Sequence, residues 1–257
     1  MNKHEARELF SGPFGKMLME TAMSYVIPLF WGIPEYEEKS VFNSGSAFIL
    51  DLGNGPFLVT AAHVYDGYLK CKSENTGLVC QLGSITFELE SRLICRRDPA
   101  KLDMATFRIS EDEIFELEKT AISDSALSLS RMKIEVEDGV FFGGFPGKLR
   151  QETGVRECEF GMYFAFTPVS SVSDRHIGCA FETEEWIDAI GNGIPEEGYD
   201  LGGISGAPLL RVTESENSLI SWQLAGVIYS ASSGIGEILF AHSSRHIQPD
   251  GQLQEQA

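Results

Sequence analysis

The chain has 257 residues and is strongly acidic, with a formal net charge of -18. A surface with this charge repels phosphate backbones and anionic lipid headgroups, so we expect neither nucleic acid nor a membrane as a direct partner. Hydrophobic residues make up 43% of the chain, which is enough for a large core, and the 26 glycines indicate many turns.

The sequence predicts a protein of the reducing cytoplasm. Its five cysteines are an odd number and form no C-x-x-C pair of the kind that binds zinc, so we expect thiols. The first residues lack the apolar core of a secretory signal. No apolar stretch approaches the roughly 18 residues of a membrane span.

The N-terminal residues 1–23 are expected to form a short helical extension. Residues 5–10 and 14–23 are helix-compatible, and Pro13 interrupts the pattern between them. The composition then changes to β-branched and aromatic residues. Residues 25–31 contain Pro28, which is typical of an edge strand.

Strands are predicted from here almost to the end of the chain, which indicates an all-β sandwich or barrel. Residues 46–52 and 56–60 flank Gly53 and Gly55, which suit a tight hairpin turn. Short helices are expected at 111–119 and 184–190, and a turn at 232–236. Further strands are expected at residues 78–82, 85–89, 105–109, 133–136, 140–142, 161–166, 176–181, 207–212 and 221–229.

Three residues that suit nucleophilic catalysis follow one another in the order His63, Asp103, Ser205. A hydroxyl is a poor nucleophile until an imidazole takes its proton, and the imidazole needs a carboxylate to fix its tautomer. His63 lies just past the predicted hairpin, and Ser205 lies in a glycine-rich turn. Asp98 competes for the role of the acid, and the strand-like residues after Asp103 favour Asp103.

The residues around these three resemble the trypsin-like serine peptidases of the chymotrypsin fold. The resemblance extends over most of residues 24–247 and is closest to the intracellular bacterial members. It implies two tandem six-stranded antiparallel β-barrels, at 24–125 with His63 and Asp103 and at 126–257 with Ser205. The matching motifs are Gly45-Ser46-Ala47-Phe48, Thr60-Ala61-Ala62-His63-Val64, Asp103-Met104-Ala105, Gly144-Phe145-Pro146-Gly147 and Gly203-Ile204-Ser205-Gly206-Ala207-Pro208.

The resemblance implies a serine endopeptidase that cleaves protein or peptide substrates through an acyl-enzyme. Ser205 would be the nucleophile, His63 the general base and then acid, and Asp103 the group that orients the imidazole. The backbone N–H groups of Gly203 and Ser205 would form the oxyanion hole. Neither a metal nor an organic cofactor is expected.

One position departs from the pattern of secreted family members. They carry an Asp directly before the nucleophile, which a newly cut N-terminus reaches, whereas this chain has Ile204. We therefore expect control by other means, with the N-terminal segment as the place where a regulatory protein partner would dock.

The specificity pocket is predicted at two segments. By the family pattern its base lies near Tyr199 and Asp200, and one wall includes Tyr229 and Ser230. Asp200 at the base would favour Arg or Lys, whereas Tyr199 would favour a smaller side chain, and the sequence leaves this choice open.

Two other functions compete with the peptidase. An α/β-hydrolase places its His after its Ser, and too few residues follow Ser205 for that fold. The second alternative is a catalytically silent or partner-gated module that binds or senses within a larger assembly.

Residues 143–147 are glycine-rich, but Lys148 is followed by Leu149 and not by the Ser or Thr of a P-loop. The remaining histidines are expected to be structural: His4, His176, His242 and His246.

Overall fold

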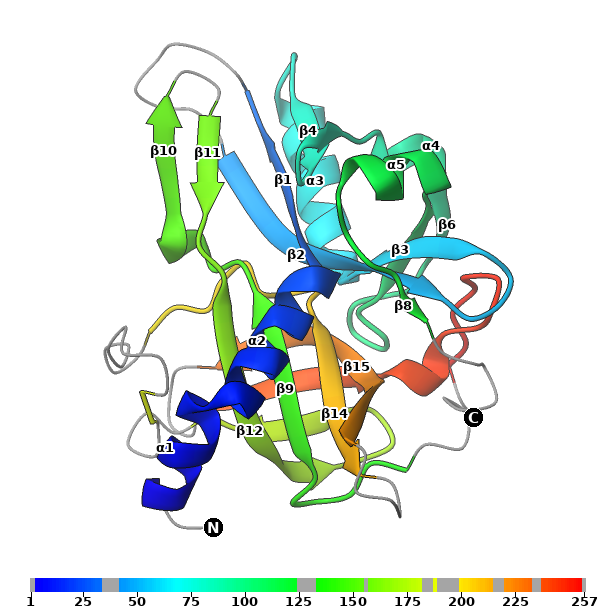
Figure 1. Cartoon of the computed structure of the whole chain (residues 1–257). Coiled ribbons are helices and arrows are strands. Elements are labelled where there is room, and N and C mark those ends of the chain that lie inside the picture. The colour runs from blue at the N-terminus through cyan, green and yellow to red at the C-terminus, as the bar shows by residue number, and fades with distance from the viewer. Residues whose placement is uncertain are drawn as a thin grey trace.

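The computed structural model describes residues 3–33, 42–123, 133–154, 157–181, 187–188, 199–214, 220–232 and 237–255. The described part is mostly β. A curled, open sheet forms from residues 26–123, and a closed barrel follows between residues 139 and 243 (Figure 1). This architecture is compatible with the chymotrypsin-like fold.

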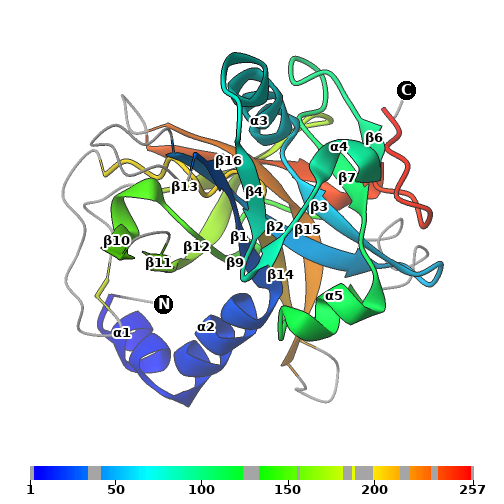
Figure 2. The same cartoon turned by 90° about the horizontal axis from the view of Figure 1, so that it is seen from above.

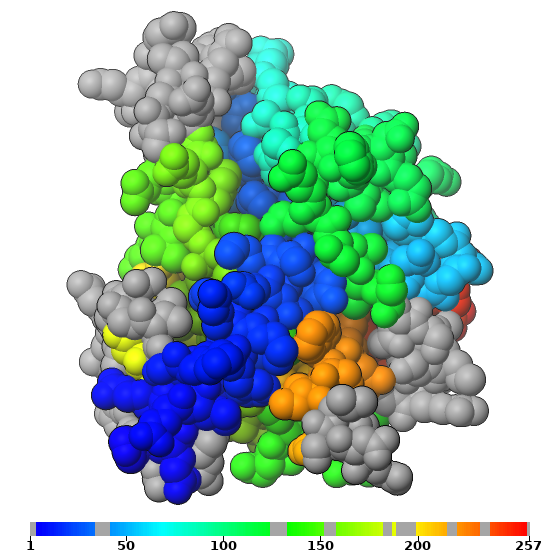
Figure 3. Space-filling model, viewed as in Figure 1, coloured from blue at the N-terminus to red at the C-terminus, as the bar shows by residue number. Residues whose placement is uncertain are grey.

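Two helices precede the first strand and pack against the barrel. Helix α1 covers Lys3–Ser11 and α2 covers Pro13–Tyr25, with the predicted break at Gly12. The helices cross closely at Gly15, where a Cβ would lie 1.9 Å from the carbonyl oxygen of Phe10. Leu18 and Ala22 of α2 are buried in a cluster that includes Phe141 of strand β9, Gly139–Gly144. The two helices therefore cover part of one face of the molecule, where they are the blue region in Figure 3.

The open sheet contains the predicted hairpin. Its turn residues Gly53 and Gly55 have φ of 97° and 98°, a left-handed conformation that glycine adopts without strain. The sheet order is β5-β4-β1-β2-β3-β7-β6, with β8 beside β2. Its strands are β1 Val26–Gly32, β2 Phe42–Asp51, β3 Pro56–Thr60, β4 Val79–Leu82, β5 Ile85–Thr86, β6 Leu93–Arg96, β7 Ala105–Arg108 and β8 Ile122–Ser123.

This first half differs from the predicted six-stranded barrel. In the described residues it is a curled sheet of eight strands, and its order ends at β5 and β6, which are not paired with each other there. The interpretation of residues 25–31 as an edge strand was wrong, because β1 lies between β2 and β4. Pro28 is tolerated since pairing with β4 begins only at Leu29.

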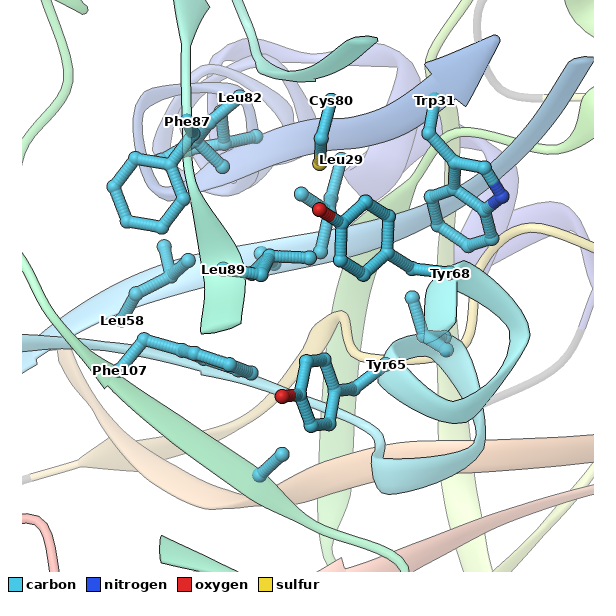
Figure 4. Packing of buried hydrophobic residues seen from close by; sticks show 14 of the residues in the cluster. Leu29, Trp31, Leu58, Tyr65, Tyr68, Cys80, Leu82, Phe87, Leu89 and Phe107 are labelled. Atoms are coloured by element: carbon cyan, nitrogen blue, oxygen red, sulfur yellow. The ribbon is translucent and has the colours of Figure 1, made fainter. Parts of the chain in front are cut away.

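A helix that the sequence analysis did not predict covers the open sheet. Helix α3, Ala62–Glu74, follows β3 directly and buries Tyr65 and Tyr68. The Tyr65 ring meets the Phe107 ring edge-on (Figure 4). Their ring centroids are 5.2 Å apart. Two short helices, α4 Leu89–Arg92 and α5 Glu111–Glu116, complete this half. A capping box between Ser110 and Glu113 starts α5.

The second half is a closed six-stranded barrel, as predicted, with the order β12-β13-β16-β15-β14-β9 (Figure 2). Its interior is filled by apolar side chains such as Phe142, Leu209 and Ile228. The strands are β9 Gly139–Gly144, β12 Tyr163–Val172, β13 Ile177–Ala180, β14 Pro208–Glu214, β15 Ile220–Ser232 and β16 Ile238–Ser243.

Smaller elements surround the barrel. Strands β10 Arg150–Gly154 and β11 Glu157–Phe160 form a separate hairpin. Two 3-10 turns lie at Gly147–Leu149 and Ser244–His246. Residues 133–136 are not a strand, contrary to the prediction. Most of the predicted helix 184–190 and of the predicted turn 232–236 lies outside the described residues. Among the described helices, none has the length and apolar character needed to cross a membrane.

Candidate active site

His63 is placed by the junction between β3 and α3. It lies in the first turn of α3, after the fully buried Ala61 and Ala62. The turn at Gly206 packs closely against this junction, because a Cβ on Gly206 would lie 3.1 Å from the Ala61 backbone nitrogen. The His63 side chain itself remains 43% exposed, so its ring is open to a substrate.

Asp103 uses both of its carboxylate oxygens to hold His63. The ring Nδ1 lies 2.6 Å from Oδ2, and the backbone N–H of His63 donates to Oδ1 at 2.8 Å. A carboxylate oxygen can only accept, so the proton lies on Nδ1 and the lone pair lies on Nε2. This is the tautomer that a general base requires.

Asp98, the competing acid, lies elsewhere. Its side chain is exposed and accepts the Ala100 amide at 3.0 Å, while its carbonyl accepts the amides of Lys101 and Leu102. This turn leaves Asp98 outside and carries Asp103 into the interior, where its side chain is 7% exposed. The structure therefore brings Asp103, and not Asp98, to His63.

Ser205 lies in a turn that the open sheet holds in place. Its carbonyl accepts the Ser46 amide of β2 at 2.8 Å, and the next amide, Gly206, donates to Ile228 at 2.7 Å. A Cβ on Gly45 would lie 2.6 Å from Val64 and 3.4 Å from the Ser205 carbonyl oxygen. The residue after His63 and the backbone of Ser205 therefore flank the same glycine, which puts the three predicted residues in one region.

The Ser205 hydroxyl donates to the carbonyl of Tyr229, with an oxygen–oxygen distance of 3.4 Å. This distance is long for an O–H···O hydrogen bond, so the bond is weak. Among the described residues, no hydrogen bond joins the Ser205 hydroxyl to the His63 ring. Catalytic hydrogen bonds are often long in the absence of substrate and tighten when it binds.

Two amides of the Ser205 turn are available to a ligand. In the described part of the chain, the amides of Gly203 and Ser205 donate no hydrogen bond. The other amides of residues 202–207 each donate one, namely those of Gly202, Ile204, Gly206 and Ala207. The Gly202 carbonyl accepts the Gly147 amide at 2.8 Å, and the Gly203 carbonyl accepts the Ser46 hydroxyl at 2.9 Å. The Gly202 C=O and the Gly203 N–H belong to one trans peptide unit and point in opposite directions. The hydrogen bond from Gly147 to the Gly202 carbonyl therefore turns the Gly203 N–H away from Gly147.

Gly203 is required by this geometry. Its φ is 107°, and a Cβ would lie 2.6 Å from the Phe145 carbonyl oxygen. The adjacent Ile204 is 1% exposed and packs against Gly144, where a Cβ would lie 3.0 Å away. An apolar contact thus fills the position at which secreted relatives of the resembled family carry an Asp.

The predicted pocket residues occupy two places. The Tyr199 ring stacks on Tyr163 at 6.0 Å, with the Lys148 ammonium 5.1 Å from its centroid. The exposed Asp200 carboxylate accepts the Gly202 amide at 2.7 Å, so it stabilises the turn that leads to Ser205. Tyr229 and Ser230 lie at a bulge of β15, next to the Ser205 hydroxyl.

Sequence reasoning missed two contributors to this region, Ser46 and His242. The Ser46 hydroxyl accepts the Phe145 amide at 3.1 Å as well as donating to Gly203, so one side chain joins three segments. The His242 ring stacks on Tyr229 at 4.1 Å. Burial, and then the Asp103 charge, raise the pKa of Tyr229, while burial lowers the pKa of His242.

No protein-family model matches this chain, and no curated protein is significantly similar to it. The assignment of a function therefore depends on the geometry of the site. Within the described ranges, no group of three or more His, Cys, Asp or Glu side chains is arranged to hold a metal ion.

Proposed function

We propose that this protein is a serine endopeptidase that cleaves peptide bonds through an acyl-enzyme. The observation that supports this most is the pair of hydrogen bonds from His63 to Asp103, at 2.6 and 2.8 Å, beside the Ser205 turn with its two available amides. A merely structural histidine would not need an acid that binds both its ring and its backbone.

In the proposed first half-reaction, the Ser205 hydroxyl oxygen attacks the carbonyl carbon of the scissile bond. Its proton passes to Nε2 of His63, and Asp103 stabilises the resulting imidazolium. The amides of Gly203 and Ser205 would stabilise the oxyanion, each contributing a factor of about 10²–10³ in rate. His63 then gives the proton to the leaving amine as the C–N bond breaks, which leaves an ester on Ser205.

In the second half-reaction, water attacks the ester. His63 takes a proton from the water, the same two amides hold the oxyanion, and the proton returns to the Ser205 oxygen as the acid product leaves. General acid–base catalysis of this kind contributes about 10²–10⁴-fold. Every step uses groups that the chain itself supplies.

The reducing cytoplasm is the proposed compartment. Burial raises the pKa of the Cys80 and Cys179 thiols to about 12, so neither is a reactive thiolate near neutral pH. Cys71 is buried as well. These thiols behave as small apolar core residues.

Labelling with a fluorophosphonate probe tests the proposed activity, because the probe reacts only with an activated serine. The parent should be labelled at Ser205, as mapped by peptide mass spectrometry. Ser205→Ala and His63→Ala should not be labelled. Ser91→Ala is the matched control, since this exposed serine only contacts the carbonyl of Glu88, and it should be labelled like the parent.

Digestion of a proteome-derived peptide library by the parent should then show cleavage and the preferred side chain. Arg or Lys at the cut would favour Asp200 as the base of the pocket, and a smaller side chain would favour Tyr199. A folded parent that neither takes the probe nor cleaves the library would refute the peptidase and favour the silent binding module.

A further inference from the structure

His242 is a buried histidine that the proposed mechanism does not use. It lies on β16 and is 4% exposed, and its Nδ1 lies 2.8 Å from the carbonyl oxygen of Arg175. A carbonyl can only accept, so Nδ1 carries the proton. The other ring nitrogen, Nε2, is buried and has no hydrogen-bond partner among the described residues. A buried polar atom without a hydrogen-bond partner lowers the stability of the folded protein. A histidine at this position therefore needs an explanation.

The ring of His242 lies against Tyr229. The two ring planes are 19° apart and their centroids are 4.1 Å apart, which is a stacked contact. The bond to Arg175 fixes the plane of the imidazole, because rotation of the ring would break it. The Tyr229 side chain therefore rests on a surface that is itself held in place.

Tyr229 is the extra residue of a β-bulge. Ile228 pairs with Ala241 and Ser230 pairs with Phe240, so Tyr229 has no residue opposite it on β16. The regular ladder between the strands thus does not fix this residue. Its carbonyl is nevertheless the acceptor of the Ser205 hydroxyl. Two ring contacts constrain Tyr229 where the ladder does not: the close stack on His242 at 4.1 Å and a looser one on Phe240 at 6.3 Å.

The charged and titratable groups around His242 are known. Asp103 favours its protonation, while burial and two neighbouring histidines oppose it, and the net effect is a lowered pKa. The His242 ring is thus neutral near pH 7. The neighbours that act on the ring are Asp103, Tyr229, His176, His246 and the Arg175 carbonyl.

We infer that His242 is a positioning residue for the nucleophile, which acts by holding Tyr229 so that the Tyr229 carbonyl sets the resting place of the Ser205 hydroxyl. This inference rests on the proposed peptidase function. It differs from a purely structural role because it requires the effect of His242 to pass through Tyr229.

A double-mutant cycle on the full chain tests this route. The variants are His242→Asn, Tyr229→Ala and the combination, and the readout is the limiting rate and the saturation constant of fluorophosphonate labelling. Asn keeps an N–H that can reach the Arg175 carbonyl but removes the ring. His242→Asn should lower the limiting rate about tenfold, as expected for a small misplacement of the nucleophile, and leave the saturation constant unchanged. In the Tyr229→Ala background the same change should cost less than about twofold.

His246→Asn is the matched control. His246 is also buried, at 7% exposure, and its Nδ1 also lies 2.8 Å from a backbone carbonyl, that of Gln254. It has no stacking contact with Tyr229 among the described residues. Both His→Asn variants should lower the thermal midpoint, but only His242→Asn should slow labelling of the folded protein.

The outcomes separate the two hypotheses. A labelled parent with additive effects of His242→Asn and Tyr229→Ala, or with equal slowing by His246→Asn, overturns the positioning role and leaves the peptidase intact. A parent that is not labelled at Ser205 overturns the peptidase, and the positioning role with it. A labelled parent supports the peptidase. Slower labelling of His242→Asn that is no longer seen when Tyr229 is already alanine supports the positioning role as well.

Discussion

The amide of Ser46 donates to the carbonyl of Ser205 at 2.8 Å, which joins strand β2 of the open sheet to the Ser205 turn beside the barrel. The Ser46 side chain strengthens this junction through its bonds to Gly203 and Phe145. One residue of the first half thus fixes three points around the two available amides of the second half, those of Gly203 and Ser205. The shape of the proposed site depends on this junction.

Replacement of Ser46 by alanine should weaken both the fold and the site. It leaves the partly buried Gly203 carbonyl and the buried Phe145 amide without their partner, which costs about 1–3 kcal/mol of unfolding free energy. Denaturant unfolding measures this loss, and the labelling rate should fall as well. Ser44→Ala, two residues earlier on the same strand, should stay within about 0.5 kcal/mol of the parent. Equal losses in the two variants would contradict the role of Ser46.

Replacement of Gly203 by alanine should remove most of the activity. The new Cβ would lie 2.6 Å from the Phe145 carbonyl oxygen at a φ of 107°, so the turn must shift and carry its amide with it. Loss of one oxyanion donor lowers the rate by about 10²–10³-fold. In Gly202→Ala the Cβ would meet the movable Asp200 carboxylate at 2.9 Å, and a much smaller loss is expected. Cleavage rates of a fluorogenic peptide chosen from the library digest compare the two variants.

Asp103→Asn should fold normally but cleave on the order of 10³–10⁴-fold more slowly, because an amide can hold the His63 ring in the wrong tautomer. Circular dichroism would check the fold and single-turnover kinetics the rate. Asp98→Asn should have little effect, since Asp98 only stabilises an exposed turn. Damage by Asp98→Asn instead would show that the acid is misassigned.

The lowered pKa of His242 predicts a specific pH dependence of stability. In the unfolded chain this histidine takes up a proton as the pH falls below about 6.5, whereas in the folded protein burial keeps it neutral. Its contribution to stability is therefore fully present above pH 6.5 and is lost as the pH falls toward its lowered folded pKa. The parent should lose more unfolding free energy between pH 8 and pH 5.5 than His242→Phe. Identical pH dependence in the two proteins would rule this out.

Much of the site could be predicted from local sequence. The glycines around residues 53–55 specify the hairpin that delivers His63, and Gly203 and Gly206 mark a turn with left-handed residues, with φ of 107° and 93°. Asp103 could be preferred over Asp98 because a strand follows it, and β7 indeed begins at Ala105. These features depend on a few neighbouring residues, which is why a pattern can indicate them.

Other features depend on contacts between distant segments. Helix α3 has no side-chain cap at Ala61 and few strong helix formers, so its stability comes from packing of Tyr65 and Tyr68 on the sheet. The failure of the first sheet to close depends on where β5 and β6 lie in space. Ser46 contacts Gly203, 157 residues away. The His242 ring stacks on Tyr229 from the neighbouring strand. No local pattern carries such information.

The C-terminal segment crosses back from the barrel to the sheet that carries Asp103. Thr106 donates to the Gly251 carbonyl at 2.6 Å, Arg97 donates to the Leu253 carbonyl at 2.9 Å, and the Leu253 side chain is fully buried. The strand after Asp103 and the turn before it are thus both held by residues much later in the sequence. Thr106 and Gly251 are separated by 145 positions, and Arg97 and Leu253 by 156. The backbone on both sides of Asp103 therefore depends on a segment that continues from the barrel, so the position of this carboxylate couples the two halves of the fold.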